Sequence, residues 1–238
     1  SPRTLARKLS ALRTFFRFLR SQGLRADDPA ALLEHPRPCR PLPSTLPYPH
    51  TAHLLAQPDG GTALGIRDQA ILELLYGSGL RVSELCGLNL TQLNLEESWV
   101  RLWGKGSKER LVPLGQEAKK ALTLYLAEGR PHFIKSFSGG NVFLSRTGRM
   151  LSRKTVWHLV RRYGLKAGLS TSAKPHLLRH CFATDLLAGG ANLRAIQEML
   201  GHSHISTTQI YTAVEKSHLL DAHAQFHPSW DADFASRV

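Results

Sequence analysis

The chain has 238 residues, of which 42% are hydrophobic, and its 31 Lys and Arg against 18 Asp and Glu give a formal net charge of +13. This length and composition suit one large or two modest folded domains and exclude a chain that is disordered by composition. No run of about 18 apolar residues occurs, which excludes a membrane-spanning helix, and the start of the chain lacks the pattern of a secretory signal.

A first helix is predicted to run from Ser1 up to Gly23. Ser1 is a good N-cap, and Pro2 stands at the first helical position. One face is apolar at the helical period and the opposite face is basic, with Arg3, Arg7, Arg13, Arg17 and Arg20. One helix cannot be a domain, and the chain begins without a methionine. We therefore interpret residues 1–28 as the last helix of a truncated N-terminal helical DNA-binding domain.

Seven of the thirteen prolines follow between Pro29 and Pro49, which indicates an extended linker over residues 29–50. A second domain is predicted over residues 51–216, mainly α with a small antiparallel β-sheet (α+β). Its helices are expected at residues 62–77, 152–166, 175–188, 192–200 and 206–214. Residues 99–103 and 110–114 are predicted strands of a hairpin with lysines at its tip, and 141–145 a third strand. Residues 217–238 form a tail.

Three cysteines, Cys39, Cys86 and Cys181, lie far apart and form no CxxC pair. Cys86 and Cys181 fall within apolar helical patterns, so we expect them to be small core residues. A sparse and odd count fits a reducing compartment and indicates the cytoplasm.

Positive charge is concentrated between Gly129 and Thr184, which hold eleven Lys and Arg and no Asp or Glu. A solubility surface would mix both signs, so this stretch indicates a polyanionic partner. DNA is favoured over a membrane, because no basic amphipathic segment stands alone, and over RNA, because no RNA-binding motif occurs. The candidate DNA-binding residues are Arg3, Arg7, Arg13, Arg17, Lys108, Arg110, Arg153, Lys154, Arg161 and Arg162.

Two arginines, Arg81 and Arg179, stand in contexts that suit a phosphate site. Arg81 follows a glycine-containing turn, Gly79-Leu80-Arg81, that opens a helix, and Arg179 lies on a later helix. A guanidinium stays charged and presents a planar fork to two oxygens of a phosphodiester. Taken singly, either arginine could be an ordinary surface charge. Glu84, three residues after Arg81, is expected to orient it or to cap the helix.

His176 and Arg179 are three residues apart and therefore share a helical face, where His176 can bond a phosphate or accept a proton. The rival interpretation pairs His176 with His180 as zinc ligands four residues apart. Zinc hydrolases with this spacing carry Glu after the first His, where this chain has Leu177. No metal and no other cofactor is therefore expected, and His180 is interpreted as a supporting hydrogen-bonding residue.

Tyr211 is the candidate nucleophile, with His202 nine residues before it in the loop Leu200-Gly201-His202. A phenol of pKa ~10 is about a thousandth ionised at pH 7, a shortfall of roughly 4 kcal/mol that a base and nearby cations can supply. If a phosphodiester is cut, the departing oxygen is a strongly basic alkoxide, so a general acid is needed. Lys105 at the hairpin tip can supply that acid, with Lys108 as its rival.

Together Arg81, Lys105, His176, Arg179, His202 and Tyr211, in this order and in these motifs, resemble the catalytic residues of the tyrosine recombinases, most closely the bacterial Xer site-specific recombinases. The resemblance covers nearly the whole chain and aligns the family's hairpin lysine with Lys105. It implies that Tyr211 forms a 3′-phosphotyrosyl link with DNA and that a free 5′-hydroxyl reverses the step without metal or ATP. Ala213 departs from the pattern, since a histidine or another polar residue commonly stands there.

The resemblance also implies the partners. Family members act on double-stranded DNA recombination sites, here expected to be dif-like, as a homotetramer or as a heterotetramer with a related recombinase. A DNA translocase is expected as an activator, and the nucleoid as the location. The tail, residues 217–238, would dock into a neighbouring subunit, although it could instead fold back on its own domain. DNA relaxation like that of a type IB topoisomerase, and DNA binding without catalysis, are the alternative functions.

Overall fold

The structure, a computed structural model, describes residues 2–34, 46–103, 109–169, 173–201 and 213–228. The chain divides into two compact units, Ser1–Ser44 and Thr45–Val238. No helix within the described ranges is long and apolar enough to cross a membrane.

The first unit contains α1 (Pro2–Ser21) and the segment that follows it. Arg13 holds the two together, because its Nε donates to the carbonyl of Ala30 at 3.2 Å and its Nη2 to that of Leu33. Ala30 is almost fully buried. The predicted linker, residues 29–50, therefore differs from the observed boundaries at both ends. Residues 29–34 fold with the first unit, and Tyr48 already starts α2.

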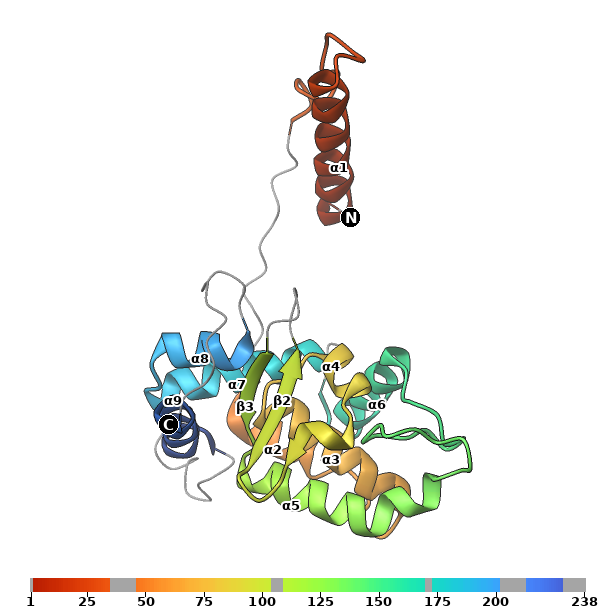
Figure 1. The fold of residues 1–238 in the computed structure, drawn as a ribbon, viewed down its shortest axis with the longest axis vertical. Helices are drawn as coiled ribbons and strands as arrows, with labels where there is room; N and C mark the ends of the chain where they lie inside the picture. The colour runs from red at the N-terminus through yellow and green to blue at the C-terminus, as the bar shows by residue number, and fades with distance from the viewer. Residues whose placement is uncertain (1, 35–45, 104–108, 170–172, 202–212, 229–238) are drawn as a thin grey trace. The chain divides into compact units, whose positions relative to one another are not determined.

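The second unit is mainly helical with one small antiparallel sheet, which confirms the predicted fold class. Its α-helices in the described ranges are α2 (Tyr48–Leu55), α3 (Ala63–Gly77), α4 (Val82–Gly87), α5 (Gln116–Leu124), α6 (Arg153–Lys166), α7 (Pro175–Gly189), α8 (Leu193–Leu200) and α9 (Ala213–Phe226). Short turns of other helical types are η1 (Leu90–Gln92), η2 (Tyr125–Gly129) and η3 (Arg130–Phe133). Figure 1 shows α8 and α9 to one side of the strands and α6 to the other.

The sheet has the order β1-β2-β3, with β1 (Leu93–Asn94), β2 (Trp99–Trp103) and β3 (Glu109–Pro113). β2 pairs with β3 from Trp99↔Pro113 to Trp103↔Glu109, as the predicted hairpin requires. The third strand expected at residues 141–145 is wrong: that segment makes only single bridges, Asn89↔Asn141 and Leu144↔Met150. The third strand of the sheet is instead β1, which pairs with β2.

The main core surrounds α3, in which twelve of 15 residues are buried. A helix that is apolar on nearly every side packs in this way at the centre of a domain. Thr62 caps its start, with Oγ1 accepting from the backbone N–H of Gly65 at 3.0 Å. Cys86 and Cys181 are buried as free thiols, as expected. Because α3 ends at Gly77, the core also fixes the start of the turn that leads to Arg81.

A second apolar cluster joins the outer face of the sheet, with Trp99 and Leu111, to α7, α8 and α9. Leu219 of α9 is 2% exposed, and His227 just beyond the helix is 1% exposed. The tail therefore packs on its own unit as far as residue 228. Residues 217–228 thus follow the alternative of folding back on their own unit, residues 229–238 lie outside the described part of the chain, and docking into a neighbouring subunit stays a prediction.

Candidate active site

The turn before α4 places Arg81. Gly79 has φ +56°, a conformation that glycine adopts readily, and a Cβ there would meet the ring of Phe182 at 2.5 Å. The backbone N–H of Arg81 donates to Glu84 Oε2 at 2.8 Å, and its Nη1 donates to Glu84 Oε1 at 2.9 Å. Glu84 therefore both caps α4 and orients the arginine, whose side chain is 40% exposed.

The Glu84 carboxylate is shared with a second arginine, Arg110 of β3. Nη1 and Nη2 of Arg110 each donate to one Glu84 oxygen at 2.8 Å, which makes a bidentate pair. The Arg110 side chain is only 6% exposed. Arg110 therefore lacks the free guanidinium that its predicted role in DNA binding requires, because its charge is paired inside the protein.

The alternation of residues along β3 contains a signal that Arg110 is buried. Side chains alternate between the two faces of a strand, so Arg110 and Val112 share one face of β3. Val112 is fully buried, as is Leu102, the residue paired with Arg110 on β2. The alternation therefore marks Arg110 as an inward-facing charge that needs a buried partner.

Arg179 lies in the second turn of α7 and is almost wholly buried. Its Nη1 donates to the carbonyl of Gly79, and its Nη2 donates to that of Leu200 at 2.7 Å. Burial, and next the nearby charge of Arg81, lower the pKa of Arg179 to about 10, so the guanidinium stays charged at neutral pH. Two guanidinium groups held close enough to repel each other make a site that favours an anion.

The C-terminal end of α8 brings the arginines together. Three successive carbonyls accept hydrogen bonds from three different arginines: Met199 from Arg110 Nε at 3.1 Å, Leu200 from Arg179 Nη2 at 2.7 Å and Gly201 from Arg81 Nη2 at 3.1 Å. The last carbonyls of a helix have no partners within the helix and carry partial negative charge, so cations are stabilised there. We call these three side chains, Arg81, Arg110 and Arg179, the arginine cluster.

The arginine cluster holds three guanidinium groups against one carboxylate. Burial alone would raise the pKa of Glu84, but the hydrogen bonds and charge of Arg110, and then the bonds from Arg81, bring that pKa below its ordinary value. Glu84 is therefore ionised at neutral pH and cancels one of the three positive charges. The remaining charge suits a phosphodiester, which gains negative charge as it reacts.

The two histidines of α7, His176 and His180, stand on either side of Arg179 in the sequence. His176 is in the first turn and is exposed. His180 is one turn later, and its Nε2 is buried with no hydrogen-bond partner among the described residues. Among the residues that the structure describes, no group of three or more His, Cys, Asp or Glu could hold a metal ion.

The remaining catalytic candidates lie outside the described residues. Lys105 and Lys108 belong to the connection between β2 and β3, and His202 and Tyr211 belong to residues 202–212 between α8 and α9. Lys108 is two residues before Arg110, and His202 directly follows Gly201. Both segments therefore join the described structure at the arginine cluster.

The predicted DNA-binding residues of α1 are placed differently from one another. Arg7 and Arg17 are exposed. Arg13 bonds two carbonyls of its own unit. The side chain of Arg3 lies outside the described part of the structure.

The predicted DNA-binding residues of α6 also divide. Arg153 and Lys154 are exposed in the first turn, and Arg161 lies over the ring of Trp157 at 5.4 Å. Arg162 instead donates to the buried carboxylate of Asp68 at 2.7 Å. The start of α6 therefore offers free cations, whereas the charge of Arg162 is paired within the unit.

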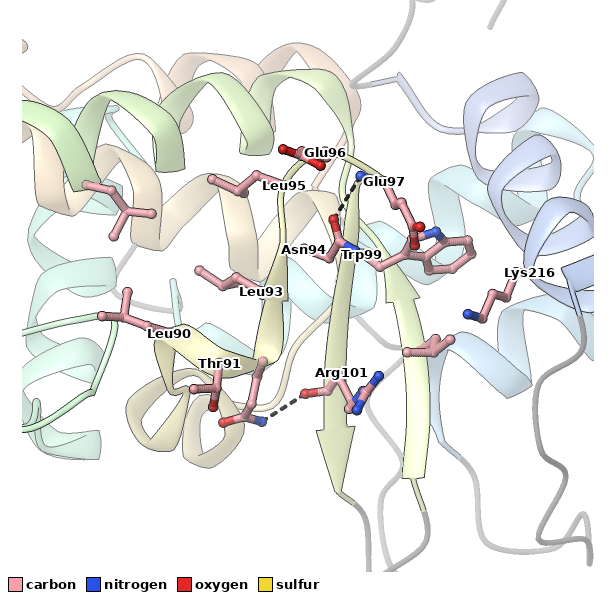
Figure 2. A pocket seen from close by; sticks show the side chains of 13 residues that line it. Leu90, Thr91, Leu93, Asn94, Leu95, Glu96, Glu97, Trp99, Arg101 and Lys216 are labelled. Atoms are coloured by element: carbon pink, nitrogen blue, oxygen red, sulfur yellow. Dashed lines mark hydrogen bonds between the residues drawn. The ribbon is translucent and has the colours of Figure 1, made fainter.

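A hollow of about 520 Å³ lies beside the sheet, and none of the arginine cluster lines it. Figure 2 shows Leu93 and Asn94 of β1 on one side of the hollow and Lys216 of α9 on the other. Glu96, Glu97 and Arg101 add charge to its lining. This hollow contributes no group to the candidate active site.

Comparisons with known proteins identify the family of this chain. A match to the phage integrase family covers residues 49–218. The tyrosine recombinase XerD of Pseudomonas putida is 47% identical over 227 residues, which is 95% of this chain and 76% of that protein. XerD of Xanthomonas campestris pv. campestris is 49% identical over 235 residues, 96% of this chain and 73% of that protein.

Two solved structures extend the comparison. The XerA recombinase is 30% identical with a TM-score of 0.61, over 92% of this chain and 75% of that one. The XerH site-specific recombinase, bound to a palindromic difH substrate in a post-cleavage complex, is 25% identical with a TM-score of 0.60. The match covers 77% of this chain and 53% of that one. The chain therefore belongs to the phage integrase family, as a Xer-type tyrosine recombinase that carries out site-specific DNA recombination.

Proposed function

We propose that this recombinase cuts a DNA strand with Tyr211 and holds it as a 3′-phosphotyrosine. The Tyr211 oxygen bonds the scissile phosphorus, the bond from phosphorus to the 5′ oxygen breaks, and the phenol proton passes to His176. Lys105 gives a proton to the departing 5′ oxygen, and His202 bonds the phosphate. A 5′-hydroxyl of the partner strand then reverses these steps, without metal or ATP.

The observation that carries this proposal is the contact of Arg110, Arg179 and Arg81 with three successive carbonyls of residues 199–201. Fixed cations stabilise developing charge best when they need no rearrangement during the reaction. The arginine cluster is held by backbone carbonyls and by Glu84, and the segment with His202 and Tyr211 begins at the last of these carbonyls. A phosphate bound by Arg81 and Arg179 would thus lie next to the start of that segment.

The other tyrosines support the choice of Tyr211. Tyr76 donates to Asp185 at 2.7 Å, Tyr163 donates to Asp68 at 3.0 Å, and Tyr125 accepts from the backbone N–H of Leu144 at 3.2 Å. Burial is the main cause that raises the pKa of each of these three phenols. Buried phenols with raised pKa values are poor nucleophiles.

We further propose that the DNA target is a dif-like site bound by a homotetramer or by a heterotetramer with a related recombinase, with a DNA translocase as activator. The XerH complex with difH supports the choice of site. The exposed cations of α1 and of the first turn of α6, Arg7, Arg17, Arg153 and Lys154, are the surface groups that would contact its backbone. This activity belongs in the cytoplasm, on the nucleoid.

The test uses a dif-like duplex with a nick next to the cleavage position, so that the cut end diffuses away and the covalent adduct accumulates. The chain is expected to form an adduct that survives a denaturing gel. Tyr211→Phe is expected to bind the duplex within about threefold of the unaltered chain and to form no adduct. Tyr48→Phe, the matched control in α2, is expected to form the adduct normally.

Two outcomes would contradict the proposal. An adduct that persists in Tyr211→Phe would exclude this nucleophile. Relaxation of a supercoiled plasmid that carries two sites, with no recombinant product, would favour the activity of a type IB topoisomerase instead.

A further inference from the structure

The guanidinium of Arg110 donates hydrogen bonds to two different parts of the second unit. Nη1 and Nη2 donate to the two oxygens of Glu84, each at 2.8 Å, and Nε donates to the carbonyl of Met199 at 3.1 Å. The residue is 5% exposed. Its bonds reach α4, where Glu84 orients Arg81, and the last turn of α8, which leads into residues 202–212.

The same residue is tied to the hairpin. Arg110 is the second residue of β3 and pairs with Leu102 of β2, so only Glu109 separates it in sequence from the connection that carries Lys105. A Cβ on Gly201 would meet Arg110 Cδ at 2.8 Å, which shows how closely the end of α8 is packed against it. A shift of β3 along its own direction would therefore disturb the bonds from Arg110 to Glu84 and to the end of α8.

We propose that Arg110 is a positioning residue that couples the hairpin to the phosphate-binding arginines. It acts through Glu84, whose carboxylate it holds where the backbone and side chain of Arg81 both bond to it. It also fixes the carbonyl two residues before Gly201. Arg110 contacts no DNA in this role. The inference rests on the proposed function, because the reaction it serves is cleavage by Tyr211.

Only arginine can make this set of contacts. A guanidinium presents a planar fork to the two carboxylate oxygens and keeps Nε for a third acceptor in the same plane. Lysine has one ammonium centre on a flexible stem, so it can neutralise Glu84 but cannot also fix the orientation of the carboxylate. Arg110→Lys therefore keeps the charge of the cluster and removes its geometry.

The test measures the rate of covalent adduct formation on the nicked duplex for the unaltered chain, Arg110→Lys, Glu84→Gln and the double variant. Arg110→Lys is expected to slow the adduct about 10- to 100-fold, the size of loss that misplacement by about 1 Å can cause. Its affinity for DNA should stay within about threefold, because Arg110 makes no phosphate contact. The double variant should be no slower than the slower single variant, because both residues act through the same carboxylate.

The matched control is Arg101→Lys. Arg101 lies on the neighbouring strand β2 and makes an exposed ion pair with Glu109 at 3.1 Å, so its replacement should leave the rate unchanged. Tryptophan fluorescence during urea unfolding checks that each variant is folded. If Arg110→Lys is not folded, Arg110→Gln takes its place in the same cycle.

Each outcome decides between the two proposals. No adduct from the unaltered chain overturns the proposed function, and this inference with it. An adduct from the unaltered chain, with Arg110→Lys cutting at the same rate, overturns the inference alone. Losses in Arg110→Lys and Glu84→Gln that multiply in the double variant, or a loss of DNA affinity that matches the loss of rate, would also overturn it.

Discussion

Two stacked imidazoles, His223 and His227, are expected to make the second unit lose stability as the pH falls. Their ring centres are 4.8 Å apart and nearly parallel, and both side chains are fully buried beside Phe182 and Tyr76. Nε2 of His223 lies 2.7 Å from the carbonyl of Gly77, at the end of α3. Burial lowers the pKa of His223 to about 4, and burial followed by the charge of His223 lowers the pKa of His227.

The direction and the size of this change in the free energy of unfolding follow from proton binding. An unfolded histidine has a pKa near 6.5, so between pH 6.5 and 4 the unfolded chain binds a proton that folded His223 does not. Stability is therefore lost as the pH falls through this window. From pH 7 to pH 5, His223 alone lowers the free energy of unfolding by about 2 kcal/mol, at 1.36 kcal/mol per pH unit. His227 adds a loss of the same sign.

A buried carboxyl opposes this loss in the unaltered chain. Burial, and next the charge of Glu117, raise the pKa of Glu73 to about 7, so folded Glu73 binds a proton that an unfolded carboxyl with a pKa of 4.5 releases. Acidification from pH 7 to pH 5 thus stabilises the unit by about 2 kcal/mol through Glu73. The gain through Glu73 is about as large as the loss through His223 alone, so a comparison between variants is needed to isolate the contribution of His223.

The assay is urea unfolding at pH 7 and pH 5, followed by tryptophan fluorescence. All four tryptophans lie beyond residue 98, so the signal reports the second unit alone. On acidification, His223→Gln should lose about 2 kcal/mol less than the unaltered chain, because glutamine does not titrate. His218→Gln, on the exposed side of the same helix, should behave like the unaltered chain. Equal losses in the unaltered chain and in His223→Gln would show that His223 does not cause the loss of stability on acidification.

Three further predictions use other parts of the structure. Gly79→Ala should lower the free energy of unfolding by about 2 kcal/mol or more, measured in urea. The new Cβ would lie 2.5 Å from an aromatic ring, and alanine rarely adopts the positive φ of this position. Arg153→Ala should reduce the salt dependence of DNA affinity by about one phosphate contact, whereas Arg162→Ala, which removes an ion pair to a buried aspartate, should lower stability and leave that dependence unchanged. Deletion of residues 229–238 should leave a folded chain that binds one site, seen by gel shift, whereas deletion of 219–238 removes part of the core and should prevent folding.

The elements that sequence predicted best are those set by local patterns. The apolar repeat predicted a helix over residues 62–77, within one residue of α3, because periodicity acts over a few positions. The contact of Arg81 with Glu84 follows from a spacing of three residues at a helix start. Both depend only on neighbours in the chain.

The features that sequence did not predict depend on distant pairings. Arg110 meets Glu84 across 26 residues and Met199 across 89, and Arg81 meets Gly201 across 120. The alternation of β3 marks Arg110 as inward-facing, but no local pattern specifies its distant partners, and Arg110 was interpreted as a DNA contact. The burial of His223 and His227 likewise depends on how α9 packs against distant elements, and no local pattern specifies it.

The central claim, that Tyr211 is linked to DNA beside the arginine cluster, is tested most directly by mass spectrometry of the trapped adduct. Trypsin cuts after Arg194 and Lys216 and releases residues 195–216, a peptide in which Tyr211 is the only tyrosine. We expect a nucleotide joined through its 3′ phosphate to this peptide at Tyr211. A nucleotide on any other peptide, or one joined through its 5′ phosphate, would contradict it.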